Sequence, residues 1–497
     1  MAWQCRLRIA VIVTASVALA CVIAYTQPAW SDEGWFASPA YNLAKHGFPG
    51  TTVIEPTGGS SGNTALLRID ERTYWIFPGQ ILLQAAWYSI VPPTLFATRL
   101  LCICFVPITL YSLYSFLRLL TGNELLAQVA IAVLGTDFVF VSQAGFARPE
   151  MMCLGFGLLA YALYTRWRET HLARAVAGAA SALALSALFH PNAVLHILGL
   201  ALVAVWLDRR RLKPWHFVLA GLPFLIVAIP WALYIMQDVE AFRAQMTQNT
   251  AGNGRFAQTW NPFALIYKEM TDRYFVVMGF DSRRASARIK AFPWLIYFAT
   301  IALVVVRKAW RSVPHGMLLV ALLALTFAIQ CVFNQKLAVY LGHVLPWYSA
   351  VFGLWFTNEQ LNTRTPKWVP AVVLGVLVAV QLALVAGRAS LSVSPSQREM
   401  VAFLRTNASQ AKLIWGSADL IFALDFDPRL RDDASLGMHS GKKADVIVVD
   451  FWDRVVFEGY KTERPAVYAF IQRQLHSYRP VLSNTAYEVY FNPATMK

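Results

Sequence analysis

The sequence predicts a polytopic α-helical membrane protein with a small soluble α/β domain at its C-terminal end. The chain has 497 residues, of which 57% are hydrophobic and only 14% are charged, whereas about 25% of the residues of a soluble domain carry charge. Its mean hydropathy is +0.46. Long apolar runs recur up to about residue 387, and charged residues become frequent after Arg388. These observations indicate a set of membrane spans followed by a soluble segment.

The apolar runs predict about eleven transmembrane helices, because a span needs roughly 20 apolar residues. The first run follows a basic start, as in a signal peptide, but no clear A-x-A cleavage signal comes after it, so we expect an uncleaved anchor. The runs between 151 and 207 are short and closely spaced. The predicted spans cover residues 9–26, 95–117, 124–143, 151–165, 174–190, 193–207, 216–236, 291–306, 317–333, 341–357 and 369–387.

The basic residues predict the orientation of these spans. The net charge is +15, and Lys and Arg concentrate in cytoplasmic loops of membrane proteins. With the N-terminus in the cytoplasm, Arg148 and Lys336 are the only Lys or Arg residues of the short outer turns near 144–150, 190–193 and 334–340. We therefore expect a protein of the cytoplasmic membrane with a cytoplasmic N-terminus, an extracytoplasmic C-terminus and no nucleic-acid partner. The inner connections carry Arg6, Arg8, Arg118, Arg166, Arg168, Arg174, Arg209, Arg210, Arg211, Lys213, Arg307, Lys308, Arg311, Arg364 and Lys367.

Three long segments are expected outside the membrane. Two of them, 27–94 and 237–290, are loops of a transmembrane domain that covers residues 1–387. In the first loop, GWFASPAYNLAKHG predicts a helix that lies in the interface, and the apolar stretch 74–93 predicts a second interfacial or re-entrant helix. The third segment, 388–497, holds 26 charged residues in 110 and contains the strand-like runs KLIW, DVIVVDF and YEVYF. It predicts a separate α/β domain.

The spacing of cysteines and histidines predicts no metal site. Five of the six cysteines lie within or at the edge of apolar segments, and none forms a CxxC pair. Neither a disulfide framework nor a thiolate zinc site is therefore expected. His46 and His196 stand alone in the sequence, and His190 is interpreted as a polar residue at the end of a span.

The first candidate site is the acidic pair Asp32 and Glu33, which follows the first span directly. One interpretation is a catalytic base held at a fixed depth at the membrane surface. The alternative is a pair of solvated acids at a helix exit, where charge is tolerated.

The second candidate is GFARPEMM, residues 145–152, a tight turn on the same predicted side as Asp32. Arg148 and Glu150 are costly among apolar spans unless they are paired or used. The alternative to a functional role is an ion pair or a pair of helix caps. Pro149 suits the first turn of the following helix.

The third candidate is NQKLAVYLGHVLPWY, residues 334–348. Lys336, Tyr340 and His343 are spaced four and three apart, which predicts one face of a helix. A cation with a phenol and an imidazole suits a phosphate at the bilayer surface. The alternative is a snorkelling lysine beside ordinary interfacial aromatic residues. The three segments together predict one site at the outer membrane face that contains carboxylates and cations.

These segments resemble the GT-C glycosyltransferases. The features that carry the resemblance are the acidic pair after the first span, an Arg-x-acid turn before the fourth span and the late Lys, Tyr and Pro-Trp-Tyr segment. The most similar group is family 39, the protein O-mannosyltransferases and the lipid A aminoarabinose transferases. The layout matches over nearly the whole chain, although each motif is short.

The resemblance implies transfer of a sugar from a polyprenyl-phosphate donor, with inversion, on the outer membrane face. Carried over by position, Asp32 is the general base for the acceptor hydroxyl, Glu33 accompanies it, and Glu150 matches a second acidic position where Asp is frequent. Lys336 matches a residue near the donor phosphate. No divalent metal is implied. A base takes the proton of the attacking hydroxyl, and cations stabilise the departing phosphate. Asp32 acting as a nucleophile in a double displacement is the alternative.

Two other functions remain open from the sequence. A transporter or flippase for a lipid-linked sugar would keep its binding groups near the bilayer midplane, within repeated halves that contain broken helices. A non-catalytic assembly or receptor protein would leave the three charged segments without a role. The predicted partners are the lipid bilayer, the lipid-linked donor and an acceptor that is a glycolipid such as lipopolysaccharide, a glycan or a protein. The loop 237–290 has eight basic and five acidic residues, a mild bias toward an anionic acceptor.

Overall fold

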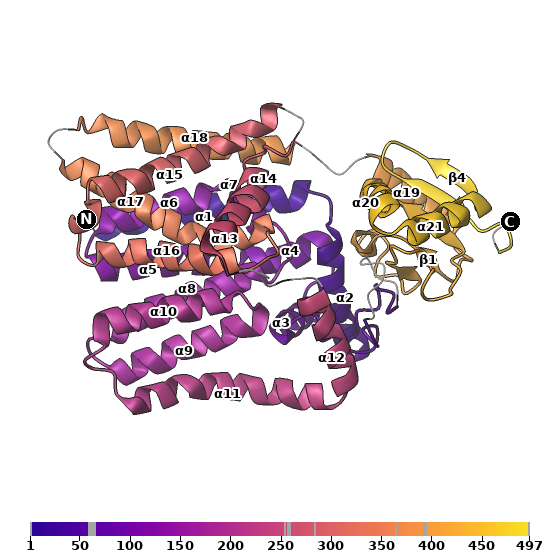
Figure 1. Cartoon of the computed structure of the whole chain (residues 1–497), viewed down its shortest axis with the longest axis horizontal. Coiled ribbons are helices and arrows are strands. Elements are labelled where there is room, and N and C mark those ends of the chain that lie inside the picture. Colours follow the sequence, from indigo (N-terminus) through magenta and orange to yellow (C-terminus); the bar gives the residue numbers. More distant parts are fainter. Residues whose placement is uncertain are drawn as a thin grey trace. The chain divides into compact units, whose positions relative to one another are not determined.

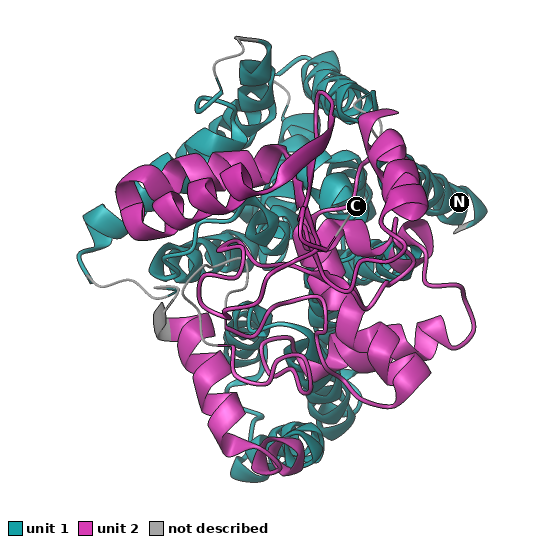
Figure 2. Ribbon diagram, turned by 90° about the vertical axis from the view of Figure 1, so that its right-hand side faces the viewer, with its two compact units in different colours: residues 1–25, 99–231, 254–390 teal, residues 26–98, 232–253, 391–497 magenta. Residues whose placement is uncertain are grey.

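The computed structural model describes residues 2–57, 66–252, 255, 260–282, 285–362, 365–390 and 395–495. The chain forms two compact units, which Figure 2 colours separately. The first unit contains residues 1–25, 99–231 and 254–390, and the second contains residues 26–98, 232–253 and 391–497. The second unit thus combines most of the first outer loop and the beginning of the second loop with the C-terminal segment.

The first unit is a bundle of helices, and most of its long helices run side by side in Figure 1. These helices are apolar, as lipid requires. In lipid a backbone N–H or C=O group finds a hydrogen-bonding partner only within its own helix, which favours helical structure. The bundle contains α1 (Ala2–Thr26), α4 (Leu95–Ile103), α5 (Phe105–Thr121), α6 (Glu124–Thr136), α7 (Phe138–Ala144), α8 (Glu150–Trp167), α9 (Leu172–Phe189), α10 (Ala193–Asp208), α11 (Pro214–Met236), α13 (Pro262–Glu269), α14 (Phe275–Val277), α15 (Ala291–Val306), α16 (Gly316–Val332), α17 (Leu345–Leu361) and α18 (Trp368–Ala389).

Each of the predicted spans coincides with one of these helices or with a consecutive pair of them. By length and apolar composition, however, only six helices of the described chain can cross a membrane alone, or seven if the bent pair α6 and α7 is one span. Helices α10 and α16 are apolar but shorter. The predicted count of about eleven therefore stays a prediction. The six are Trp3–Thr26, Leu95–Thr121, Leu172–Phe189, Pro214–Met236, Ser286–Val306 and Trp368–Ala389.

Asp137 marks the break between α6 and α7, which are bent by 64°. Its Oδ1 accepts hydrogen bonds from the backbone N–H groups of Val139 (2.9 Å) and Phe140 (3.2 Å). Its Oδ2 accepts hydrogen bonds from the Tyr297 hydroxyl (2.9 Å) and the Gln381 amide (2.8 Å). A carboxylate has about four acceptor positions, so this buried charge is satisfied as the N-cap of α7.

The second unit contains a five-stranded sheet with helices on both faces. Its helices are α2 (Ser31–His46), α3 (Pro78–Tyr88), α12 (Val239–Thr247), α19 (Pro395–Asn407), α20 (Phe451–Glu463) and α21 (Pro465–Ser477). Its strands β1 (Ile414–Trp415), β2 (Leu430–Arg431), β3 (Val446–Val449), β4 (Arg479–Ser483) and β5 (Glu488–Phe491) have the order β2-β1-β3-β5-β4. Strands β2, β1 and β3 are parallel, and β5 is antiparallel to both β3 and β4. Helix α3 has 11 residues, too few to span a bilayer.

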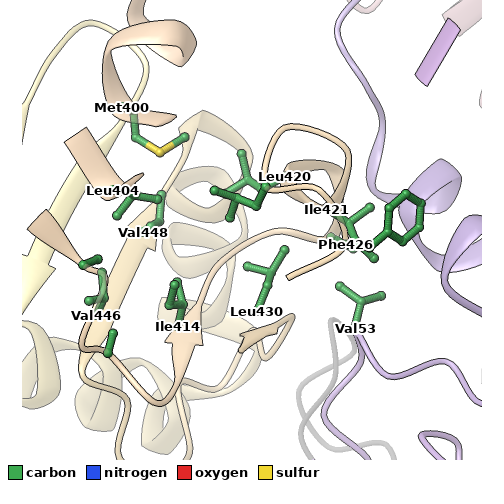
Figure 3. Packing of buried hydrophobic residues seen from close by; sticks show 14 of the residues in the cluster. Val53, Met400, Leu404, Ile414, Leu420, Ile421, Phe426, Leu430, Val446 and Val448 are labelled. Carbon is green, nitrogen blue, oxygen red and sulfur yellow. The ribbon is translucent and has the colours of Figure 1, made fainter. Parts of the chain in front are cut away.

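Alternate side chains of the buried strands point to opposite faces of this sheet. Ile447 and Val449 pack with residues of α20 and α21. Val446 and Val448 join a larger cluster with Met400 of α19 (Figure 3). Ala37 of α2 and Val53 of the first loop belong to the same cluster, so the first outer loop completes the core on this face of the sheet.

Candidate active site

The acidic pair lies in the first turn of α2, in the second unit. Glu33 is buried, and its Oε2 accepts a hydrogen bond from the backbone N–H of Trp30 at 2.9 Å. The N–H of Glu33 in turn donates to the carbonyl of Trp30 at 2.9 Å. Glu33 therefore helps to cap the helix, and a carboxylate suits the N-terminus of a helix dipole. Asp32 is half-buried beside it.

Helix α2 is docked onto the C-terminal sheet domain within the second unit. A Cβ atom on Gly34 would lie 2.1 Å from the carbonyl oxygen of Ala418, so only glycine permits this approach. The indole Nε1 of Trp35 donates a hydrogen bond to Asp432 Oδ2 at 3.1 Å. The C-terminal domain thus fixes the helix that carries Asp32, a relation that the sequence does not show.

Arg148 and Glu150 form a buried ion pair in the first unit. Arg148 Nε lies 3.2 Å from both carboxylate oxygens of Glu150, and its NH2 group lies 2.7 Å from Oε1. Both side chains are at most 5% exposed. This paired geometry, one of the two interpretations of the turn, holds the guanidinium in one orientation at the start of α8.

The second and third candidate segments meet around His190, at the end of α9. His190 Nε2 is 3.9 Å from Glu150 Oε1. Its ring centroid lies 5.5 Å from that of Tyr340 and 6.5 Å from that of His343. The turn at 145–152 and the segment at 334–348 therefore belong to one buried polar cluster.

Lys336 belongs to a second group of charged side chains, together with Glu269 and Arg273. Its Nζ lies 2.7 Å from Glu269 Oε2, and Arg273 Nη1 lies 2.9 Å from Glu269 Oε1. Burial raises the pKa of the Glu269 carboxyl, and burial lowers the pKa of the Lys336 ammonium, each against the opposing charge of its partner. Gln330 joins this group to the first one, because its Oε1 accepts from Arg273 at 2.9 Å and its Nε2 donates to the Tyr340 carbonyl at 2.7 Å.

The prediction that Lys336, Tyr340 and His343 share one helix face is wrong for Lys336. Tyr340 and His343 lie three apart in the 3-10 helix η5 (Ala338–His343), where such residues stack on one side. Lys336 precedes this helix, in irregular chain. It turns instead toward Glu269 and toward the carbonyls of Gln330 and Cys331, which close α16.

Three members of this cluster, Glu269, Arg273 and His190, do not stand out as site residues in the sequence. Glu269 and Arg273 were counted only as charges of the loop 237–290, although their separation of four residues is a usual signal for an ion pair on a helix. Arg273 is fully buried. His190 was interpreted as a helix end, and only the fold shows that it faces Glu150 and Tyr340.

Comparison with known proteins identifies this architecture. Residues 71–244 match the family model described as dolichyl-phosphate-mannose-protein mannosyltransferase. No curated protein matches the chain in sequence. The structure of ArnT from Cupriavidus metallidurans bound to undecaprenyl phosphate is similar, with a TM-score of 0.60 and 13% identity over 99% of this chain and 98% of that chain.

The oligosaccharyltransferase of Archaeoglobus fulgidus in its apo form is similar as well, with a TM-score of 0.59 and 12% identity over 99% of this chain and 74% of that chain. A complex of the same archaeal enzyme with an inhibitory peptide and a dolichol-phosphate gives a TM-score of 0.52 and 10% identity, over 97% of this chain and 74% of that chain. The resemblance predicted from the sequence is thereby confirmed at the level of the fold: the chain is a multi-pass membrane protein whose fold is similar to those of ArnT and the archaeal oligosaccharyltransferase.

Proposed function

We propose that the protein is a membrane glycosyltransferase that moves a sugar from a polyprenyl-phosphate donor to an acceptor hydroxyl, on the outer face of the cytoplasmic membrane. One observation supports this most strongly. The fold resembles, over 99% of the chain, that of ArnT, whose structure holds undecaprenyl phosphate. The match to the mannosyltransferase model over residues 71–244 points to the same chemistry.

The proposed reaction is a single displacement at the anomeric carbon. The acceptor oxygen forms a bond to that carbon, and the bond from carbon to the phosphate oxygen breaks, with inversion. Asp32 takes the proton of the acceptor hydroxyl, and the polyprenyl phosphate leaves with the electron pair. A phosphate is a competent leaving group once cations stabilise it, so the reaction needs neither a general acid nor a divalent metal.

The first unit supplies the proposed donor-binding groups. Arg148, Lys336, Tyr340 and His343 are assigned to the phosphate and the sugar. Glu150 is already paired with Arg148 through both of its oxygens. We therefore propose that Glu150 positions the guanidinium of Arg148. The direct catalytic role that the resemblance implies for Glu150 stays a prediction. Glu33 is assigned to holding the first turn of α2, beside the base.

A flippase for a lipid-linked sugar is the second candidate, and the broken helix pair at Asp137 is the feature that favours it. The hydrogen bonds of Asp137 argue against a transport site there. Both carboxylate oxygens accept two hydrogen bonds from the protein itself, which leaves no acceptor position for a substrate.

The test compares cells with and without the gene by mass spectrometry of envelope glycolipids and glycoproteins. A glycosyltransferase adds a defined sugar mass to one class of molecule and so reveals the acceptor. Purified protein in liposomes that contain the donor should then release polyprenyl phosphate only when this acceptor is present.

Asp32→Asn is expected to abolish this release, by about 100-fold or more in rate, while the variant still binds the donor. Turnover of Asp32→Asn at the wild-type rate would remove Asp32 from the mechanism. Movement of the intact donor between leaflets, without release of polyprenyl phosphate, would establish the flippase instead.

A further inference from the structure

Three buried side chains from separate parts of the first unit form a group of metal-ligating type. Cys153 of α8, His196 of α10 and His343 of η5 are each at most 1% exposed. Their ligand atoms all lie within 4.8 Å of one another. His196 Nε2 and His343 Nδ1 are 3.1 Å apart. We propose that this group binds a single zinc-type cation, so that His343 holds the metal rather than contacting the donor directly.

The distances fit such an ion after a small contraction. Zinc binds imidazole nitrogen at about 2.0–2.1 Å and thiolate sulfur at about 2.3 Å, in a tetrahedron, which places ligand atoms about 3.3–3.6 Å apart. The two histidine nitrogens are already at close to this spacing. Only the thiol of Cys153 has to approach them, by about 1 Å, for the three to share one ion.

The chemistry of the donors selects the metal. One sulfur and two imidazole nitrogens suit Zn²⁺ or copper, whereas Mg²⁺ and Ca²⁺ prefer oxygen ligands. Binding replaces the hydrogen bond between the two imidazoles and releases the thiol proton to solvent. His343 then coordinates through Nδ1 and carries its proton on Nε2. That nitrogen is buried and has no hydrogen-bond partner among the described residues, so it is available for the proton.

Neighbouring residues hold the ligands in place. The Ser186 hydroxyl of α9 lies 3.2 Å from Cys153 Sγ and 2.7 Å from the Cys153 carbonyl. A Cβ atom on Gly157 would lie 2.4 Å from the ring of His196, so glycine at this position of α8 makes room for the imidazole. Outer contacts of this kind orient metal ligands.

The position of the site suggests what the ion does. Cys153 follows Glu150 by three residues in α8, and His343 follows Tyr340 by three residues in η5. An ion between them would tie α8, α10 and η5 together. It would thereby fix the separation between the turn that carries Arg148 and the segment that carries Tyr340. The metal-binding inference itself stands without the proposed function.

The experiment measures metal in the purified full-length protein, prepared with an affinity tag that contains no histidine. After incubation with Zn²⁺ and removal of free metal, elemental mass spectrometry should find about one zinc per chain. Cys153→Ser and His196→Gln should each reduce this to background. Cys331→Ser and His216→Gln, which change a buried cysteine and a buried histidine elsewhere, should retain the zinc.

A second measurement needs no variant. Co²⁺ bound to the wild-type protein should show the charge-transfer band of a thiolate ligand and the visible bands of a tetrahedral site. Absence of Zn²⁺, Co²⁺ and copper binding by the wild-type protein would overturn the proposal and leave the group as a hydrogen-bonded histidine pair. Retention of zinc by both Cys153→Ser and His196→Gln would overturn it equally.

Discussion

Lys336 uses all three of its ammonium hydrogens on neighbours within the first unit. It donates to the carbonyls of Gln330 and Cys331 at 3.1 and 3.0 Å, and its Nζ lies 2.7 Å from Glu269 Oε2. A lysine has three donors. To bind the donor phosphate, Lys336 would therefore have to exchange one of these partners for a phosphate oxygen.

Two variants separate a donor-binding role from a structural one. Lys336→Met leaves Glu269 with Arg273 as its one ionic partner among the residues that the structure describes, and breaking a buried ion pair costs about 3–5 kcal/mol. We expect a lower unfolding midpoint in detergent for the single variant, and recovery of most of this loss in the double variant Lys336→Met/Glu269→Gln. If Lys336 binds the phosphate, the double variant remains poor in its use of the lipid donor, measured as an increased apparent KM.

Two results would count against these assignments. An unchanged midpoint for Lys336→Met would show that the ion pair contributes little to stability. A wild-type KM for the double variant would show that Lys336 is structural. Gln360→Met, near the end of α17, is a control for handling of the variants, because its side chain donates to the Lys367 carbonyl at 3.2 Å.

At the scale of elements, the docking of α2 decides where Asp32 is held. Gly34 lies next to the acidic pair, and the backbone of Ala418 in the 3-10 helix η6 (Ala418–Ile421) passes directly against it. A side chain at this position would meet backbone rather than the flexible end of another side chain. The neighbouring backbone would have to move.

Gly34→Ala should therefore displace α2 from the C-terminal domain. The new Cβ would lie 2.1 Å from the Ala418 oxygen, and overpacking of this kind costs about 1–3 kcal/mol. We expect sugar transfer to fall by at least about 10-fold, because a displacement of about 1 Å in a catalytic group is costly, while donor binding is retained. Hydrogen exchange of α2 amides checks the displacement directly.

Gly459→Ala provides the matched control. Gly459 lies within α20 of the same unit, and a Cβ atom there meets nothing within 4 Å. Alanine should be neutral or slightly stabilising in a helix. Equal activity of the two alanine variants would contradict the docking role of Gly34.

At the scale of the whole molecule, local sequence patterns predicted the secondary-structure elements. Only the fold revealed the clusters of side chains that interact. The spans and the two loop helices follow from apolar runs, and each coincides with helix in the structure. The count of about eleven spans stays a prediction, because six helices of the described chain, or seven with the bent pair, are long and apolar enough to cross a membrane alone. The cost of burying charge predicts that Arg148 and Glu150 are either paired or functional, and the structure shows the ion pair, which was the alternative to a functional role.

The features that the sequence did not predict depend on contacts between residues that are far apart in the sequence. Cys153, His196 and His343 are far apart in the sequence, so no spacing rule brings them together, although their ligand atoms lie within 4.8 Å of one another. The partner of Lys336 lies in another segment. Similarly, the packing of the first loop against the C-terminal sheet arises from Ala37 and Val53 in a shared core, which no single segment encodes.

The C-terminal domain carries a group of buried acids that should make the whole molecule less stable at higher pH. Burial, with the nearby charge of Asp450, raises the pKa of Asp419 to about 8. Burial likewise raises the pKa of Asp432 to about 7, against the hydrogen bond from Trp35. Asp453 and Asp450 face them and have raised pKa values too. The positive charge of Arg454 acts on Asp450 and opposes the rise of its pKa.

The direction in which stability changes with pH follows from the number of protons that each state binds. The unfolded chain titrates these carboxyls near 3.8, so between about pH 4 and pH 8 the folded state holds more protons than the unfolded state. Stability should therefore fall as pH rises through this window, by up to about 1.4 kcal/mol per pH unit for each such group. Thermal unfolding of the full chain in detergent, read from pH 4 to pH 9, measures this.

Asp419→Asn should flatten the decline, because an amide keeps the shape of the carboxyl and does not titrate. Asp425→Asn is the matched control: Asp425 is 81% exposed and has a φ of 54°, which asparagine tolerates. It should leave the slope unchanged. A constant unfolding midpoint from pH 5 to pH 8 would show that these acids are already ionised and compensated in the folded domain.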